Sequence, residues 1–268
     1  EKGYEMDAYM KRLGICDDYF ALNISLIYMY ASCGLLITAQ DIFDKIPFQD
    51  ISAWTAIIIG YTEQGYNDRA LECYEQMQLQ GISANHYISS SILKACGNIG
   101  ALEKGMEIHA QIKQNGLDKD PSIGNALIAM YMRCRFFSRV RDSFDNLESH
   151  DTLTWTSLLA GYAENGRNEE ALRCLECMLH NGIKANDISF LYALKTHIAS
   201  GAIDKGEATY AEIARLGFFK SNLIVGNTLV DMYAKFGFLA KAEEVFDHLP
   251  CKDAVSWTTL ISGYAALG

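Results

Sequence analysis

A long internal repeat constrains this chain of 268 residues more than any other feature. Its three tryptophans, Trp54, Trp155 and Trp257, are each followed by threonine and stand 101 and 102 residues apart. After the first two, the same residue types recur at identical offsets, as Met77 and Met178 illustrate. A fixed period of this kind is typical of arrays in which each repeat is one supersecondary unit.

Shorter repeats of three kinds make up the long period. One kind carries Trp-Thr and Gly-Tyr, a second carries Leu-Lys followed by Gly-Ala, and a third carries Asn with a later Met-Tyr. These anchors give repeats of 31, 35, 35, 31, 35, 36 and 31 residues, flanked by two incomplete ones. The boundaries are 1–19 (incomplete), 20–50, 51–85, 86–120, 121–151, 152–186, 187–222, 223–253 and 254–268 (incomplete).

Each repeat has the pattern of two amphipathic helices. In repeat 51–85, Trp54 and Tyr61 belong to one apolar stripe at helical spacing, Gly65 interrupts it, and a second stripe runs to Met77. One such hairpin cannot bury its apolar face alone, so neighbours must stack. We therefore predict an all-α, right-handed superhelix of helical hairpins over 1–268, with the tryptophans, Met77 and Met178 in the core.

Composition supports a folded chain and excludes several classes. Half of the residues are apolar, only 21% are charged and only three are proline, which argues against disorder and against collagen-like sequences. No apolar run is long enough to cross a bilayer, so we expect no membrane partner. The first residues resemble neither a secretory signal nor a transit peptide. Eight dispersed cysteines suggest free thiols.

The patterns of catalytic and metal sites are missing or incomplete. Cys174 and Cys177 form a C-x-x-C on one predicted helix, without the second pair that a zinc site needs. Pro250-Cys251 is followed by Ala254 where the P-C-x-x-C of zinc deaminases has its second cysteine, and no histidine starts an H-x-E. His109 is expected to be packed in the core. We predict no enzyme activity, cofactor, metal or small-molecule substrate.

The repeat lengths and anchors together resemble one family, the pentatricopeptide repeat (PPR) proteins of the PLS subclass. Tetratricopeptide arrays use 34-residue repeats of one type and would not alternate 31 and 35 residues. By the cyclic order of the subclass, 51–85 and 152–186 resemble P repeats, 86–120 and 187–222 L repeats, and 20–50, 121–151 and 223–253 S repeats. Residues 1–19 resemble an incomplete L repeat and 254–268 an incomplete P repeat, so we expect the parent protein to be longer.

The resemblance implies binding of single-stranded RNA, one base per repeat, through the fifth residue of the first helix and the last residue of the repeat. The expected adenine readers are Thr55 with Asn85 and Thr156 with Asn186. The expected uracil readers are Asn125 with Asp151 and Asn227 with Asp253, and Thr258 is the fifth residue of the last, incomplete repeat. The predicted RNA core is A-x-U-A-x-U, read 5′ to 3′ from the N-terminal side.

The other repeats depart from the pattern. Ser90 with Asp120 would suggest guanine if L repeats followed the same rule, whereas Leu191, paired with Asn222, cannot hydrogen-bond a base. Repeat 20–50 has Ile24 at the fifth position, and a one-residue bulge could bring Asn23 there instead; otherwise this repeat is silent.

The family also places each base between apolar side chains at the second positions of adjacent repeats. These positions hold Ala21, Ser52, Tyr87, Ser122, Leu153, Ile188, Ile224 and Val255. At the thirteenth positions only Arg133 and Lys235 are basic, and we name them as candidate phosphate contacts. Since the formal net charge is −10, we expect weak, salt-sensitive and mostly base-directed binding.

Two alternatives remain open. Asn, Asp and Thr near a helix start can be capping residues without any ligand. An acidic helical array can also be a scaffold that binds a peptide or protein without touching RNA. The resemblance favours the targeting array of an RNA-editing (C-to-U) or RNA-processing factor of chloroplasts or mitochondria, with possible protein partners such as editing cofactors.

Overall fold

The computed structural model describes residues 20–216 and 222–267. Every regular element in these ranges is a helix, as the all-α prediction requires. The incomplete repeat predicted at 1–19 lies outside the described residues. The helices are α2 (Phe20–Ser32), α3 (Leu36–Lys45), α4 (Ile51–Glu63), α5 (Asn67–Leu79), α6 (His86–Ile99), α7 (Leu102–Gln114), α8 (Pro121–Arg133), α9 (Phe137–Asp145), α10 (Thr152–Glu164), α11 (Asn168–His180), α12 (Asp187–Ser200), α13 (Ile203–Leu216), α15 (Leu223–Lys235), α16 (Leu239–Asp247) and α17 (Ala254–Leu267).

The complete repeats are helical hairpins, and glycine shapes the turn in all of them except 121–151, where Arg135 adopts φ +56°. In repeat 51–85 the first helix ends before Gly65, which adopts φ +82°, and Gly166 adopts φ +71° at the matching turn. Only glycine reaches this left-handed region without strain, which explains why it recurs there. The amide of Tyr66 then donates to the carbonyl of Tyr61 at 2.9 Å and closes the helix end.

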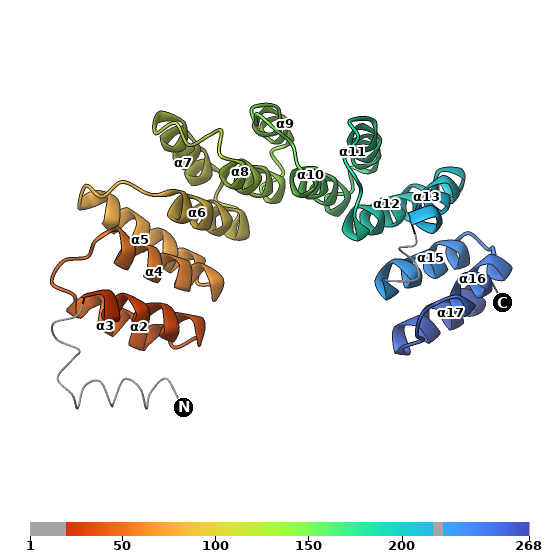
Figure 1. The fold of residues 1–268 in the computed structure, drawn as a ribbon, viewed down its shortest axis with the longest axis horizontal. Coiled ribbons are helices and arrows are strands. Elements are labelled where there is room, and N and C mark those ends of the chain that lie inside the picture. The colour runs from red at the N-terminus through yellow and green to blue at the C-terminus, as the bar shows by residue number, and fades with distance from the viewer. Residues whose placement is uncertain (1–19, 217–221, 268) are drawn as a thin grey trace. The chain divides into compact units, whose positions relative to one another are not determined.

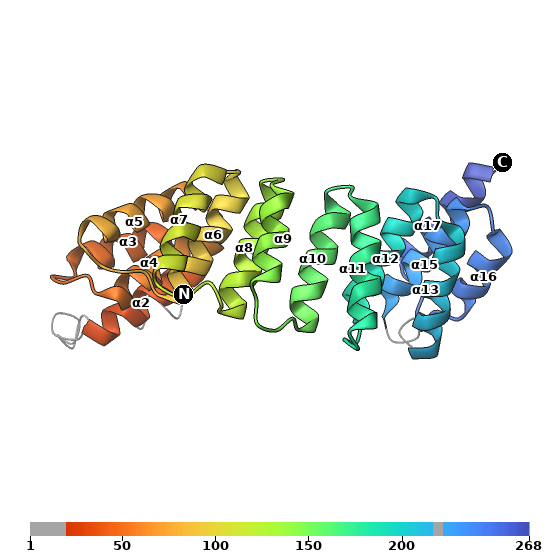
Figure 2. The same ribbon diagram turned by 90° about the horizontal axis from the view of Figure 1, so that it is seen from above.

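The chain divides into two compact parts, which we call the N-terminal part (1–148) and the C-terminal part (149–268). Within the N-terminal part, the first helices α2, α4, α6 and α8 pack in sequence order, and each second helix packs against the first helix of its own repeat. The C-terminal part has the same arrangement, with α10, α12, α15 and α17 in one row. Figure 1 and Figure 2 show the two rows in each part.

The predicted core residues are buried in repeat 51–85 and repeat 152–186. Trp54, Met77 and Met178 are at most 1% exposed, and the Trp54 ring meets Phe43 edge-on with centroids 4.7 Å apart. Trp257 contradicts the core prediction, since half of its surface is exposed. It packs on Phe246 with the same edge-on geometry, and α17 packs mainly on α15 and α16 among the described helices.

Close contacts between neighbouring first helices explain further recurring glycines. A Cβ on Gly60 would lie 2.5 Å from the Cβ of Ala31, and a Cβ on Gly263 would lie 2.5 Å from that of Ala234. Since real side chains never approach so closely, glycine is required where these helices touch.

Several smaller predictions concern the same helices. His109 is half-buried on α7 and its Nδ1 lies 2.8 Å from the hydroxyl of Tyr131, as expected for a packed histidine. Cys174 is buried and Cys177 is exposed on α11. None of the described helices combines the length and apolar character needed to cross a membrane.

Candidate nucleic-acid interface

The last residue of every complete repeat caps the first helix of the next. In each case a side-chain oxygen accepts a hydrogen bond from the first turn of that helix, as in the 2.9 Å contact from the Ile88 amide to Asn85 Oδ1. The seven capping residues are Asp50, Asn85, Asp120, Asp151, Asn186, Asn222 and Asp253. Capping engages Oδ1 and leaves the second polar atom of the side chain for other contacts.

Threonine at the fifth position is tied to its own helix. Thr55 Oγ1 donates to the carbonyl of Ile51 at 2.5 Å, and Thr156 Oγ1 donates to that of Thr152 at 2.6 Å. Both threonines are 5% exposed. Thr258 makes the same bond to Ala254 at 2.6 Å but is exposed. The hydroxyl hydrogen of each threonine is therefore donated within its own helix. The oxygen can still accept a hydrogen bond from another residue or from a ligand.

In repeat 51–85 the structure brings the two predicted reading residues together. Asn85 Nδ2 donates to Thr55 Oγ1 at 3.1 Å, although the residues are 30 positions apart. The amide of Asn85 thus links the start of α4 to the start of α6. Its orientation is fixed from both ends, by the helix cap and by Thr55.

In repeat 152–186 the same two residue types meet through a third. Ser189 Oγ lies 3.0 Å from Thr156 Oγ1 and donates to Asn186 Oδ1 at 2.8 Å. The Ser189 amide also donates to Asn186 Oδ1 at 2.8 Å, and the Asn186 amide donates to Ser189 Oγ at 3.5 Å, which completes a capping box. Ser189 is fully buried and was not among the predicted site residues. A serine three residues after the cap was the pattern that could have identified it.

The predicted uracil pair of repeat 223–253 is also in contact. Asn227 Nδ2 donates to Asp253 Oδ1 at 3.4 Å, and Asn227 is 8% exposed. The amide and hydroxyl of Ser256 donate to the same carboxylate oxygen at 2.8 and 2.9 Å. These hydrogen bonds, first those from Ser256 and then that from Asn227, lower the pKa of Asp253 below its usual value, so the carboxylate is ionised at neutral pH.

The pair Asn125 and Asp151 belongs to two different parts of the molecule. Asn125 is half-buried on α8 of the N-terminal part. Asp151 caps α10 of the C-terminal part, where the amide and hydroxyl of Thr154 each donate to its Oδ1 at 2.8 Å. Those two bonds lower the pKa of Asp151. The pairing of Asn125 with Asp151 stays a prediction.

The remaining reading positions differ from these pairs. Ser90 Oγ lies 3.5 Å from the hydroxyl of Ser122, whose amide donates to Asp120 Oδ1 at 2.8 Å. Leu191 is half-buried, and Asn222 Nδ2 donates instead to Asp187 Oδ2 at 2.7 Å.

At Ile24 the structure excludes the bulge. Helix α2 is continuous from Phe20 to Ser32, so Asn23 keeps its place one residue before the fifth position. An uninterrupted α-helix advances every residue by the same angle, and Ile24 therefore occupies the position that Asn125 has on α8.

All the second positions lie on the surface, next to the capping residues. Ala21, Ser52 and Ser122 are exposed in the N-terminal part, where Tyr87 is the large side chain at 59% exposure. In the C-terminal part all four are aliphatic and 47–62% exposed: Leu153, Ile188, Ile224 and Val255. Exposed apolar side chains at regular intervals are suited to contact flat, partly apolar ligands such as nucleobases.

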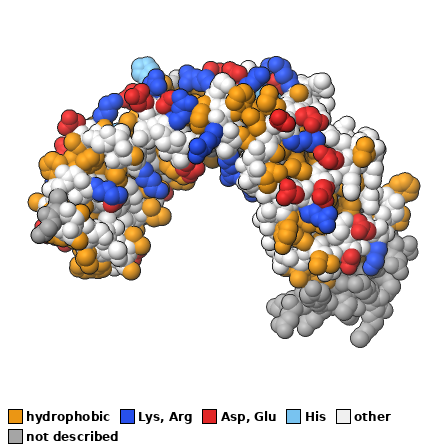
Figure 3. All heavy atoms as spheres, turned by 180° about the vertical axis from the view of Figure 1, so that it is seen from behind, with side chains coloured by type: hydrophobic (Ala, Val, Ile, Leu, Met, Phe, Trp, Pro, Cys, Tyr) orange, Lys and Arg blue, Asp and Glu red, His pale blue; other side chains and the backbone are white. Residues whose placement is uncertain are grey.

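The two candidate phosphate contacts already have protein partners. Arg133 Nη1 donates to Asn98 Oδ1 on the neighbouring repeat. Lys235 Nζ forms an ion pair with Asp231 Oδ2 at 2.8 Å, one turn earlier on α15. On the face drawn in Figure 3, basic side chains alternate with acidic ones. Electrostatic attraction to a phosphate backbone is correspondingly limited here.

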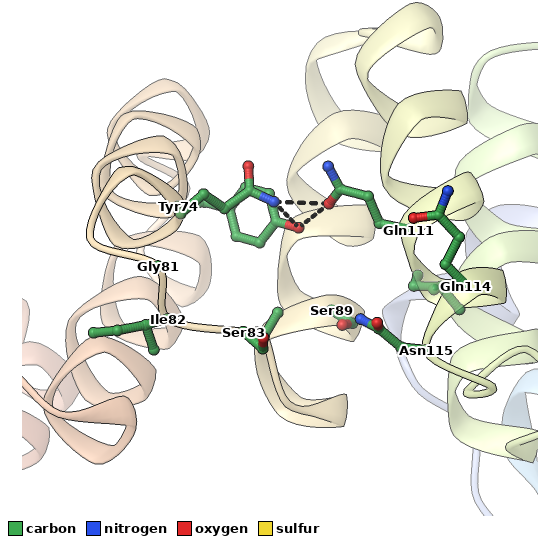
Figure 4. A pocket seen from close by; sticks show the side chains of 11 residues that line it. Tyr74, Gly81, Ile82, Ser83, Ser89, Gln111, Gln114 and Asn115 are labelled. Carbon is green, nitrogen blue, oxygen red and sulfur yellow. Dashed lines mark hydrogen bonds between the residues drawn. The ribbon is translucent and has the colours of Figure 1, made fainter.

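Hollows at the second helices differ between the two parts. In the N-terminal part, Tyr74, Gln78 and Gln111 form a closed network of hydrogen bonds of 2.7–3.0 Å at the hollow between α5 and α7, as Figure 4 shows. The matching hollow in the C-terminal part is lined by apolar residues such as Leu175 together with buried His197. No group of His, Cys, Asp and Glu in the described ranges is arranged to hold a metal ion.

Comparison with known proteins relates this architecture to one family. The family models described as PPR repeat family and PPR repeat match residues 150–197 and residues 52–82, 227–253 and 255–268, respectively. Two crystal structures of PPR10 superpose with TM-scores of 0.70, for the protein described as from maize, and 0.79, for PPR10 in complex with an 18-nt psaJ RNA element. They cover 88% and 99% of this chain and 36% and 40% of theirs, at 19% and 20% identity, which confirms the solenoid fold.

Curated relatives from Arabidopsis thaliana are more similar in sequence. Pentatricopeptide repeat-containing protein At4g18520, chloroplastic, is 35% identical over 99% of this chain and 43% of its own length. Pentatricopeptide repeat-containing protein At3g24000, mitochondrial, is 33% identical over 91% of this chain and 38% of its own length. The chain thus spans less than half of these relatives, and their designations support an organellar location. By its repeats, its fold and these relatives, the chain belongs to the pentatricopeptide repeat proteins.

Proposed function

We propose that this chain binds single-stranded RNA with sequence preference, one base per repeat. The observation that carries the proposal is the contact between fifth and last residues within a part of the molecule: Thr55 with Asn85, and Asn227 with Asp253. Each pair sets polar atoms beside exposed second-position side chains. PPR10, which shares the fold, was crystallised with an RNA element.

The chemistry of each pair suits an unpaired base. Capping holds the last side chain in one orientation, so its second polar atom meets the Watson–Crick edge at little entropic cost. The neutral amide of Asn85 offers donor and acceptor groups, as adenine requires. The ionised carboxylate of Asp253 with the amide of Asn227 offers acceptors beside a donor, which suits the N3–H and carbonyls of uracil.

Stacking supplies the apolar share of the binding energy. In the C-terminal part, the exposed aliphatic side chains of Leu153, Ile188, Ile224 and Val255 provide one such contact in each repeat. Since Arg133 and Lys235 are engaged by Asn98 and Asp231, phosphate contacts add little. Binding is therefore base-directed and stronger as part of the longer chains in which such repeats occur.

We further propose that the chain follows the PLS order and serves as the targeting array of an organellar RNA-editing or RNA-processing factor, without catalysis of its own. The repeat lengths of 31, 35 and 36 residues support the subclass. The chloroplastic and mitochondrial designations of the relatives support the organelle.

The first test measures fluorescence anisotropy of labelled RNAs carrying A-x-U-A-x-U against their complement and the DNA version, at two salt concentrations. We expect preference for the predicted RNA. The double variant Asn227→Thr with Asp253→Asn should move the preference at the last base from uracil to adenine. Asp68→Asn, which removes the same charge from the exposed surface of α5, is the control and should leave the preference unchanged.

Two outcomes would contradict the proposal. An unchanged base preference in the double variant would exclude one-base reading by this pair. Absence of RNA binding at low salt would favour the second candidate, a scaffold for a peptide or protein, which the apolar hollow beside Leu175 and the acidic net charge favour.

A further inference from the structure

The two repeats with the same predicted reading pair do not present the same hydrogen-bonding groups. Repeats 51–85 and 152–186 both combine threonine at the fifth position with asparagine at the last. They differ three residues after the asparagine, where Ile88 stands in one and Ser189 in the other. Both side chains are fully buried, so neither can touch a ligand directly.

Valence counting shows what this difference does to the asparagines. An asparagine side chain has two hydrogens on Nδ2 and two lone pairs on Oδ1. Asn85 uses one lone pair for the Ile88 amide and one hydrogen for Thr55. It therefore keeps one donor and one acceptor for a ligand.

Asn186 is engaged differently. Both lone pairs of its Oδ1 are used, by the amide and the hydroxyl of Ser189, each at 2.8 Å. Among the described residues its Nδ2 makes no hydrogen bond, so both hydrogens face a ligand. Ser189 has one hydroxyl hydrogen, and we assign it to Asn186 Oδ1 at 2.8 Å rather than to Thr156 Oγ1 at 3.0 Å. Thr156 gives its own hydrogen to Thr152, as Thr55 does to Ile51, so the two repeats differ at the asparagine.

From this geometry we infer that Ser189 is a positioning residue that sets the base preference of the preceding repeat, 152–186, by converting Asn186 into a pure donor. The inference rests on the proposed RNA binding. Adenine presents an amino donor beside a ring acceptor, and guanine presents a carbonyl acceptor beside a ring donor. Asn85, whose amide is held in one orientation by Ile88 and Thr55, can satisfy both adenine groups, whereas guanine presents its donor and acceptor in the reverse order. Asn186 can donate to the ring nitrogen of adenine or to the carbonyl of guanine, so it discriminates less between them.

Three of the four matching positions in the C-terminal part carry a hydroxyl, and the fourth is Val225. Thr154 and Ser256 donate to the capping carboxylates of Asp151 and Asp253 in the same way. The matching residues of the N-terminal part are the apolar Leu22, Ala53, Ile88 and Ile123. The residue three positions after the capping side chain thus varies between repeats whose predicted reading pairs are the same.

The test compares adenine and guanine at the base assigned to each repeat, using the full chain and RNAs that differ at that base alone. Ser189→Ala removes only the hydroxyl and should raise the adenine-over-guanine affinity ratio about 3- to 10-fold, the effect of one hydrogen bond. Ile88→Thr adds a hydroxyl to the other repeat and should lower the ratio there by a similar factor. Ser189→Thr retains the hydroxyl and should leave the ratio as it is.

A purely structural role would change affinity for both bases equally and leave the ratio constant. Thermal unfolding of each variant shows whether it is folded at the temperature of the titration. The inference is overturned if Ser189→Ala leaves the ratio unchanged while Asn186→Ala alters it. If Asn85→Ala and Asn186→Ala both leave the base preference unchanged, one-base reading itself fails, which separates the two results.

Discussion

Residues 51–120 and 152–222 are two copies of the same pair of repeats, yet they have diverged in different ways on their two rows of helices. Along the first helices, the caps and the pair of Thr55 with Asn85, repeated as Thr156 with Asn186, are retained, whereas Ser90 with Asp120 becomes Leu191 with Asn222. Along the second helices, the polar network of Tyr74, Gln78 and Gln111 is replaced by Leu175, Leu179 and Glu212. The first helices also differ inside the core, where Cys96 on α6 corresponds to buried His197 on α12. The comparison shows that the helix caps and one reading pair are retained while the residues around them vary.

The largest expected effect concerns the tryptophan common to the repeats. Trp54→Ala should lower the free energy of unfolding of the N-terminal part by about 3–5 kcal/mol, because the ring is fully buried against Phe43. Trp257→Ala, where the ring is half exposed, should cost clearly less. Urea unfolding followed by circular dichroism measures both. Equal losses of stability in the two variants would show that the edge-on contact with phenylalanine, which both tryptophans make, contributes more to stability than the burial of the ring.

The second prediction concerns Cys96 and His197 and is a pH dependence confined to one copy. Burial, and then the positive charge of Lys205, lower the pKa of His197 to about 4, against an effect of Glu176 that raises it. Since the unfolded chain binds the proton more tightly, the stability contributed by neutral His197 is complete above pH 6.5 and is lost as the pH falls toward 4. The loss should be on the order of 2–3 kcal/mol.

His197→Cys, which copies the residue of the other repeat, is the control for that titration. Between pH 7 and pH 4, the free energy of unfolding of the variant should depend less on pH than that of the parent chain. The carboxylates are the same in both proteins, so their contribution cancels in the comparison. An identical pH dependence in the two proteins would mean that His197 does not titrate in this range.

The third prediction sharpens the comparison on the first helices. Tyr87 and Ile188 occupy the same second position in the two copies, and both are exposed. Under the proposed function, Tyr87→Ala should reduce RNA affinity by about 1–2 kcal/mol, roughly tenfold, because an aromatic ring stacks on a base. Ile188→Ala should reduce it less. Anisotropy titration decides the order, and a larger effect at Ile188 would contradict stacking at Tyr87.

The smallest expected effect concerns the polar network on the second helices. Tyr74→Phe removes the hydrogen bond of 2.7 Å to Gln111 and should cost about 1 kcal/mol of stability, because the amide of Gln78 still donates to Gln111. Tyr66→Phe, at an exposed tyrosine of the same repeat, is the matched control and should be neutral. Equal stability of the two variants would show that the network is replaceable by apolar packing, as in the other copy.

The sequence was sufficient for the helices and their starts. The recurring anchor residues placed the end of each complete repeat at an Asn or Asp, and the structure shows that this residue caps the next helix. Burial of Trp54 and Met77 followed from helical spacing in the same way. Such features are local or strictly periodic, and a single chain displays them directly.

Contacts between side chains of different repeats could not be predicted from local or periodic patterns. The network of Tyr74 with Gln111 spans 37 residues and breaks the period, so no pattern indicated it. The role of Ser189 depends on how close its hydroxyl comes to two side chains from the preceding repeat. Trp257 was placed in the core by analogy with its copies, although burial depends on which helices surround it rather than on its own sequence.

The capping role of the last residues has a consequence for how such an array can change its target. Asn and Asp are nearly equivalent as helix caps, whereas Ala in their place costs about 1 kcal/mol. An exchange of Asp253 for asparagine therefore alters the groups offered to a ligand and keeps the helix cap, whereas an exchange of Asn85 for aspartate keeps the cap but loses the hydrogen bond to Thr55. The last position of a repeat can thus change between asparagine and aspartate without losing the cap of the next helix. The need for that cap restricts the position to polar residues, which under the proposed function are the residues that can recognise a base.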